Sequence, residues 1–494
     1  MLRPNNLNSI KKPLTLVQVF LICSFEFLIL LFISSKYIFE NDEGIWSYIG
    51  RVWHRNNLLP YIHTVENKTP FIYYLHYMSD FLFGVNFYFV RFLGIVAVLL
   101  TSHVLYRIMS LILNMYAGII ASILYCLIMT WQIVDGATMG STEVFMNLFS
   151  ITGLYYIILY FKTNVVLNIL KSGFYFCLAI QTKQIAIITL VGVFIYLLFY
   201  SHNKNNGILK QIILLFLGLI IGFILTFIPL YLSNISFSDY VNGAWFILLN
   251  PGSSLNTFQG RINSFIEIFI GTKLFLISIV FLLLLFFKFE NVQKRYKHFF
   301  VLIFIFEFIA INASGTYSGH QLKQIIPILT IFLSIIFNNL FFSDRFNKWS
   351  FKKFLYFLIL LFFPYDQMLN SLYFNYKNKH KSYIESVNLR DYINLHYSSE
   401  RYIYIFGNCK TINPILAISE RLSPIKNFNN YFLRTKIDLI QASINFKKNP
   451  PNIIFVEKDF NIYSNYGSDI YYFINNTYDY KAFKEGFSIL EKKN

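Results

Sequence analysis

Residues 40–76 read ENDEGIWSYIGRVWHRNNLLPYIHTVENKTPFIYYLH, a charged, histidine-containing segment that lies between two strongly apolar runs. The flanking runs, at roughly 15–37 and 86–106, are each long enough to cross about 30 Å of hydrocarbon as a helix. Because a spanning helix satisfies its own backbone while a charged loop needs water, this pattern predicts a loop at a membrane surface.

The composition of the whole chain agrees with this interpretation. The chain has 494 residues, of which 56% are hydrophobic and 20% aromatic, well above the apolar fraction of soluble domains. Further apolar runs are found at 115–133, 143–161, 165–181, 185–200, 211–232, 266–287, 298–313, 324–342 and 354–369. We therefore expect an α-helical polytopic membrane protein with about eleven transmembrane helices.

The distribution of basic residues predicts the orientation. Arg3, Lys11 and Lys12 precede the first run, which is too long for a signal peptide and lacks a small-residue cleavage site, so we expect it to be retained. Basic residues also gather in the other loops assigned to the inside, at Lys204, Lys210, Lys288, Lys294, Arg295, Lys297, Arg345, Lys348, Lys352 and Lys353. The positive-inside rule then places the amino terminus in the cytoplasm and the first loop, 39–85, on the outer face.

Charge and cysteine content exclude two other classes. The formal net charge of +17 would suit nucleic acid, but much of the excess lies in short loops beside spans, where topology and anionic lipid account for it. The four cysteines, Cys23, Cys126, Cys177 and Cys409, are scattered without disulfide or metal-ligand spacing.

After residue 370 the long apolar runs end and the chain becomes rich in Asn, Lys, Tyr and Ser. The segments 401–408 and 452–458 are short, β-rich and bounded by breakers, which predicts strands, and amphipathic segments between them predict helices. We expect a transmembrane domain over 1–370 and a small C-terminal α/β extracytoplasmic domain over 371–494.

The first outer loop carries the candidate chemistry. Asp42 and Glu43 place two carboxylates at the membrane surface, where they could act as bases, bind metal, or simply begin a solvated loop. Residues 45–56 predict an amphipathic interfacial helix, with Arg51 pointing away from the apolar face. Lys68 lies where the chain re-enters apolar surroundings, a position that suits a lipid phosphate.

Several motifs in this loop and beyond it resemble a known family. In order they are DEGxWxYxGRVW (42–53), Pro-Tyr (60–61), Lys-x-Pro (68–70), LFGxNxxxxRxxG (82–94), MGSTEVFMNLF (139–149), LAIQTKQIAI (178–187) and SGHQLKQIIP (318–327). This order is similar to that of bacterial polyprenyl-phosphate-dependent glycosyltransferases, which are C-type membrane enzymes related to protein O-mannosyltransferases and to the aminoarabinose transferase acting on lipid A. The sequence departs from the family's pattern at Gln321 and Thr69, where tyrosine and a second proline are common.

The resemblance implies a C-type glycosyltransferase fold and the transfer of a hexosyl or pentosyl group from a polyprenyl-phosphate donor on the outer face of a bacterial inner membrane. The acceptor would be a hydroxyl of an envelope glycolipid such as lipopolysaccharide, of another glycan or of a protein. It assigns Asp42 as the general base and gives catalytic roles to Glu43 and Glu143, which could also hold a divalent cation. A single base without an evident nucleophile suggests inversion.

The expected substrate-binding residues are basic or aromatic. They are Arg51, Tyr61, Lys68, Lys183, His320 and Lys323. Lys183 could instead mark a structural turn, because a charge at mid-membrane costs about 2.5–3.5 kcal/mol, and His320 and Lys323 could simply begin a helix. Arg91, near the start of the second span, would either reach the surface or pair with a carboxylate.

Two other functions fit a protein with many spans. A transporter or flippase of lipid-linked sugars also has intramembrane charges, but the sequence lacks paired Gly/Pro-broken spans in matching halves. A polysaccharide polymerase or ligase would carry its arginines in a large outer loop, whereas the first outer loop here begins with acidic residues.

Overall fold

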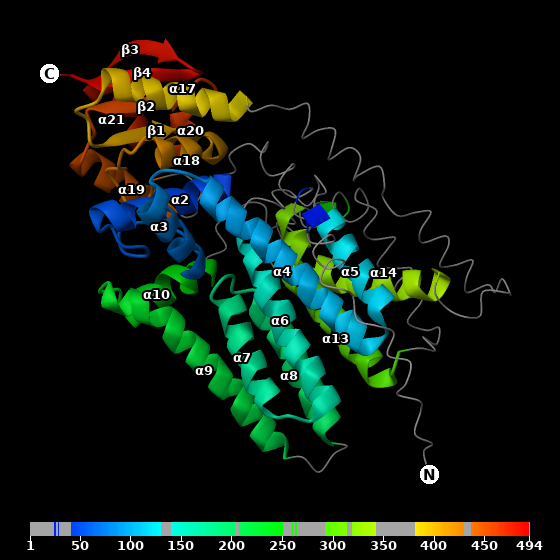
Figure 1. The fold of residues 1–494 in the computed structure, drawn as a ribbon. Coiled ribbons are helices and arrows are strands. Elements are labelled where there is room, and N and C mark those ends of the chain that lie inside the picture. The colour runs from blue at the N-terminus through cyan, green and yellow to red at the C-terminus, as the bar shows by residue number, and fades with distance from the viewer. Residues whose placement is uncertain are drawn as a thin grey trace, which may run out of the picture.

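The computed structural model describes residues 41–129, 140–202, 207–249, 292–313, 319–341, 381–428 and 436–493, together with a few isolated positions. Its amino-terminal part is a bundle of apolar helices, and its carboxy-terminal part is a sheet with helices around it (Figure 1). Two short helices of the first outer loop, α2 and α3, lie between the bundle and the C-terminal part (Figure 1).

The apolar runs predicted between residues 86 and 232 and between 298 and 342 each form a helix. These are α4 (Tyr88–Ile112), α5 (Met115–Ile128), α6 (Thr142–Thr163), α7 (Leu167–Ile180), α8 (Ala186–His202), α9 (Ile208–Leu232), α13 (Lys294–Ala313) and α14 (Ile326–Phe341). The runs predicted at 15–37, 266–287 and 354–369 lie outside the described residues, apart from isolated positions.

Four of these helices, α4, α6, α9 and α13, are long and apolar enough to cross a membrane, and α5, α7, α8 and α14 are shorter apolar helices. The predicted number of about eleven spans stays a prediction. Glycines bring neighbouring helices together: a Cβ atom on Gly173 of α7 would lie 2.1 Å from the Leu215 carbonyl oxygen of α9. Small residues at such crossings let helix backbones approach closely within lipid.

The first outer loop contains α2 (Asn41–Asn56) and α3 (Phe71–Phe83). The predicted helix over 45–56 is confirmed, but the expected exposed position of Arg51 is wrong, since that side chain is only 2% exposed. The reason is that α2 packs against α3 on one side and against the C-terminal helix α18 on another. A Cβ atom on Gly50 would lie 2.6 Å from the His76 backbone, which shows how closely α2 and α3 approach.

Two further short elements follow α9. These are α10 (Phe237–Ala244) and the 3-10 turn η2 (Phe246–Leu249). A capping box starts α10: the Ser236 side chain accepts from the Asp239 backbone amide while the Asp239 carboxylate accepts from the Ser236 amide. Tyr240 of α10 then packs edge-on against Tyr61 of the first outer loop.

The C-terminal part is built on a four-stranded sheet in the order β1-β2-β4-β3. Its elements are α17 (Lys381–His396), β1 (Ile403–Phe406), α18 (Cys409–Ile418), α19 (Lys436–Lys448), β2 (Ile453–Glu457), α20 (Ile462–Tyr466), α21 (Ser468–Thr477), β3 (Tyr478–Lys484) and β4 (Phe487–Lys492). The predicted strands coincide with β1 and β2, which pair in parallel, whereas the antiparallel hairpin of β3 and β4 was not predicted.

Candidate active site

Asp42, the expected base, lies in the first turn of α2 and is half-buried. The side-chain amide of Asn41 donates to its Oδ1 at 3.4 Å. Across the described ranges the carboxylate of Asp42 joins no ion pair, in contrast to the next residue. A half-buried carboxylate without an ion-pair partner at the start of a helix can accept a proton from a group that approaches it.

Glu43 is buried and fully engaged with Arg91 of α4. Arg91 Nε donates to Oε1 at 2.8 Å and Nη2 donates to Oε2 at 2.7 Å, which is the bidentate geometry of a strong guanidinium–carboxylate pair. Of the two alternatives for Arg91, the structure therefore shows pairing with a carboxylate. Glu43 is held against the membrane bundle through this pair.

Glu143 lies in the first turn of α6 and is buried. Its Oε1 forms an ion pair with the Lys183 ammonium, and Thr142 Oγ1 donates to its Oε2 at 3.1 Å. Lys183 lies in the turn between α7 and α8, which confirms that it does not sit in the middle of a helix.

Lys323 is buried beside the same end of α6. Its Nζ donates to Ser141 Oγ at 3.0 Å, and its backbone oxygen accepts from Asn147 Nδ2 at 2.7 Å. The residue belongs to the 3-10 segment η5 (Gly319–Gln324), which also contains the backbone of His320. Lys183 and Lys323 thus place two ammonium groups at the start of α6.

Lys68 and Tyr61 are brought together in the segment before α3. The Tyr61 hydroxyl donates to the Lys68 backbone oxygen at 2.8 Å, and Tyr61 adopts a left-handed backbone conformation with φ of 67°. Lys68 Nζ lies 3.1 Å from Asn67 Oδ1 and 3.6 Å from Glu66 Oε1. Since burial raises the pKa of Tyr61 well above its ordinary value, this phenol stays protonated and can donate.

The Lys68 segment is also tied to the Thr-Lys-Gln turn at 182–184. Gln184 Nε2 donates to the Asn67 carbonyl at 2.6 Å and to the Ala244 carbonyl at 2.7 Å. Gln184 immediately follows Lys183, so a single turn contributes the partner of Glu143 and a brace for the Lys68 segment. These residues, far apart in sequence, meet at the same ends of the bundle helices.

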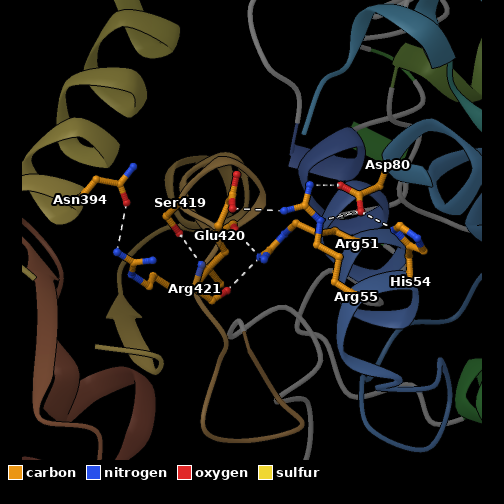
Figure 2. A network of polar contacts seen from close by, with 9 residues as sticks. Arg51, His54, Arg55, Asp80, Asn394, Ser419, Glu420 and Arg421 are labelled. Atoms are coloured by element: carbon orange, nitrogen blue, oxygen red, sulfur yellow. Dashed lines mark hydrogen bonds and ion pairs between the residues drawn. The ribbon is translucent and has the colours of Figure 1, made fainter. Parts of the chain in front are cut away.

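Arg51 lies elsewhere. Its Nη2 donates to the backbone oxygens of Leu416 at 3.0 Å and Arg421 at 2.8 Å, both in the C-terminal part (Figure 2). Burial lowers the pKa of this guanidinium. These two carbonyls occupy Nη2, while the buried Nε of Arg51 has no hydrogen-bond partner among the described residues. The expectation that Arg51 binds substrate stays a prediction.

Sequence reasoning missed Asp80 of α3, which joins two basic residues of α2. Its carboxylate accepts from His54 Nδ1 and from Arg55 Nε, both at 2.8 Å (Figure 2). Arg55 also reaches Glu420 of the C-terminal part at 3.1 Å. The groups are separated by a loop, so no local spacing could have revealed the contact.

The sequence also missed Asn413, whose side chain donates to Asn41 Oδ1 next to the expected base. Among the residues that the structure describes, no three His, Cys, Asp or Glu side chains come together to hold a metal. Glu43 and Glu143, the two candidate ligands, bind Arg91 and Lys183 respectively. A divalent cation at either carboxylate would compete with these cations.

Comparisons with known proteins concern the fold of the chain. The family described as dolichyl-phosphate-mannose-protein mannosyltransferase matches residues 67–231, and no curated protein matches the chain. ArnT from Cupriavidus metallidurans, bound to undecaprenyl phosphate, has a TM-score of 0.62 at 11% identity, covering 96% of this chain and 97% of that chain.

Two other solved structures are similar. The apo oligosaccharyltransferase of Archaeoglobus fulgidus has a TM-score of 0.55 at 14% identity, covering 89% of this chain and 70% of that chain. The arabinofuranosyltransferase AftD from mycobacteria has a TM-score of 0.52 at 11% identity, covering 98% of this chain and 42% of that chain. The resemblance to C-type membrane glycosyltransferases is confirmed, and the chain has the fold of a multi-pass membrane protein of this kind.

Proposed function

We propose that the protein is an integral-membrane glycosyltransferase that moves a hexosyl or pentosyl group from a polyprenyl-phosphate donor to a hydroxyl acceptor. The observation that carries this proposal is the contrast between Asp42 and the two other candidate carboxylates, Glu43 and Glu143. Glu43 and Glu143 are buried against cations, whereas Asp42 is half-buried and joins no ion pair within the described ranges. Asp42 is therefore the carboxylate best placed to take a proton.

The proposed reaction has one displacement step. The acceptor oxygen attacks the anomeric carbon of the sugar, its proton passes to the carboxylate of Asp42, and the bond from that carbon to the phosphate oxygen breaks. Proton removal by a positioned carboxylate contributes roughly 10²–10⁴ in rate. Because attack and departure occur on opposite faces of the sugar, the reaction inverts the configuration.

The leaving polyprenyl phosphate needs a cation where its charge grows. Lys68 is the candidate, because its ammonium is half-buried in a segment fixed by Tyr61 and Gln184. Lys323 and Lys183 lie further along the outer ends of the bundle helices and are second candidates for the lipid head group. Fixed cations in a poorly hydrated site stabilise a developing anion strongly.

The proposal includes an orientation. The start of α2, the turn at Lys183 and the C-terminal part would face the outer side of a bacterial inner membrane, with the amino terminus in the cytoplasm. Lipid carriers in the names of similar structures support such a donor: one ArnT structure holds undecaprenyl phosphate, and an Archaeoglobus fulgidus oligosaccharyltransferase structure holds dolichol phosphate. The acceptor would be an envelope glycolipid, another glycan or a protein hydroxyl.

The test separates transfer from transport. Purified protein in liposomes is given undecaprenyl-phosphate esters of radiolabelled mannose, glucose and arabinose, with a bacterial envelope extract as the acceptor. The proposal predicts that label leaves at least one lipid and becomes covalently attached to an acceptor. Label that crosses the bilayer while still attached to its lipid would instead indicate a flippase.

A further inference from the structure

The C-terminal helix α18 touches the first turn of α2, where the proposed base lies. A Cβ atom on Gly44 would lie 2.6 Å from the carbonyl carbon of Asn413 and 2.7 Å from the nitrogen of Pro414. The two backbones therefore meet with no room for a side chain at position 44. This contact brings a C-terminal residue next to Asp42.

Asn413 is that residue. Its side chain is 0% exposed, and its Nδ2 donates to Asn41 Oδ1. Since Oδ1 of Asn41 accepts this bond, the Asn41 amide nitrogen points the other way and donates to Asp42 Oδ1 at 3.4 Å. Two amides thus connect the C-terminal part to one oxygen of the carboxylate.

Other contacts hold α18 to α2 independently of these amides. Arg51 donates to the carbonyls of Leu416 and Arg421, and the Ser423 backbone amide donates to the Tyr48 hydroxyl at 2.9 Å. All of them lie further along α2 than Asp42. Removal of the Asn413 donor should therefore leave the two parts docked and release the side chain of Asn41.

We propose that Asn413 is a positioning residue for Asp42, acting through Asn41; this inference rests on the proposed function. The hydrogen bond from Asn41 fixes Oδ1 and the rotamer of the carboxylate, which leaves Oδ2 to receive the proton of the acceptor hydroxyl. Through Asn413, the C-terminal part thereby orients the catalytic carboxylate, and Asn413 itself contacts neither substrate. Its effect should appear in kcat and not in the binding of the donor.

The test compares Asn413→Leu, Asn413→Asp and the control Glu420→Gln, which alters a neighbouring exposed contact to Arg55. Each variant is assayed with whichever radiolabelled undecaprenyl-phosphate sugar the wild type uses. Loss of one aligned hydrogen bond predicts a fall in kcat of about five- to tenfold for both Asn413 variants, with the donor KM unchanged. Asn413→Asp keeps the size of the side chain, but its carboxylate would accept from the amide of Asn41 and turn that amide away from Asp42. This variant therefore remains informative if Asn413→Leu fails to fold.

A double-mutant cycle with Asn41→Ala distinguishes positioning from general destabilisation. If Asn413 acts through Asn41, Asn413→Leu adds no further loss once Asn41 is alanine. Losses that multiply in the double variant, a changed donor KM, or wild-type kcat in both Asn413 variants would overturn the inference. A wild-type protein that transfers no sugar would instead count against the proposed function itself.

Discussion

Arg91 binds both carboxylate oxygens of Glu43, at 2.8 and 2.7 Å, in a place where both side chains are buried. The residue after the proposed base is thereby fixed to α4 of the bundle, while the residue before it, Asn41, accepts from the C-terminal Asn413. Asp42 lies between these two attachments. The start of α2 is thus held from both sides, and only its central carboxylate lacks a buried cationic partner within the described ranges.

The first prediction concerns this buried ion pair. Glu43→Gln removes the buried carboxylate charge that pairs with the guanidinium of Arg91, and a loss of about 3–5 kcal/mol in the free energy of unfolding is expected. A double variant with Glu43→Leu and Arg91→Leu should lose less, because no charge is left alone. Chemical unfolding in detergent measures both. Equal losses of unfolding free energy in Glu43→Gln and in the double variant would mean that a buried Arg91 without Glu43 carries no extra cost.

The second prediction concerns Lys183. Replacement by methionine keeps the aliphatic length but leaves the buried Glu143 without its cation, so the thermal midpoint should fall together with transferase activity. Lys183→Arg should preserve the charge and much of the stability. Lys171, which is exposed on α7 and lies over the Tyr156 ring, supplies the control variant Lys171→Met. A stable, fully active Lys183→Met protein would contradict the expectation.

The third prediction tests the contact between α2 and α18. Gly44→Ala forces a methyl group into the backbone of Asn413 and Pro414, so the helices must separate and activity should fall at least tenfold. Gly207→Ala is a matched control, because a Cβ atom there would meet nothing within 4 Å. The measurements are the sugar-transfer rate and the thermal midpoint of both variants. Equal values for Gly44→Ala and Gly207→Ala would show that the contact between α2 and α18 has room for a methyl group.

The fourth prediction concerns His76 of α3. Burial lowers its pKa from 6.5 to about 3, and neither ring nitrogen has a hydrogen-bond partner among the described residues. The unfolded chain therefore takes up a proton at a higher pH than the folded protein. The stability that neutral His76 permits is complete above pH 6.5 and is lost as the pH falls from 6.5 toward 3, by up to about 1.4 kcal/mol per pH unit.

The measurement is the difference between wild type and His76→Leu. The variant should lose less stability on acidification across this window, because its folded state no longer excludes a proton. His396, which is exposed in α17, provides the control variant His396→Leu, for which no such difference is expected. Parallel pH profiles for wild type and His76→Leu would argue against a buried neutral imidazole.

Long apolar runs predicted the helices of the bundle that the structure describes, because a spanning helix needs only such a run and the run is local in the sequence. The strands β1 and β2 were predicted for a similar reason, as short β-rich segments between breakers. The hairpin of β3 and β4 was missed because β3 is mostly exposed and its polar sequence, YDYKAFK, gives a weak strand signal. Its turn has positive φ at Glu485 and Gly486, 48° and 84°, as two-residue hairpin turns require. The first of these positions holds Glu, whereas Asn or Asp is usual there.

The candidate site was predictable where a motif carried it and not where contacts join distant segments. Asp42, Glu143 and Lys68 were singled out from local patterns. The hydrogen-bond acceptors of Arg51 could not be predicted, because they are main-chain oxygens more than 300 residues later in the sequence, at Leu416 and Arg421. An amphipathic pattern assigns a charged residue to the solvent face of a helix, and here a second helix covers that face.

Sugar transfer by Asp42→Asn decides whether Asp42 is the base, and Asp391→Asn, at an exposed carboxylate of α17, is its control. Both are purified in lipid and given the labelled undecaprenyl-phosphate sugar that the wild type uses. We expect Asp42→Asn to lose about 10²–10⁴ in kcat at an unchanged thermal midpoint, while Asp391→Asn keeps wild-type activity. Transfer by Asp42→Asn at the wild-type rate would contradict the assignment of Asp42 as the base.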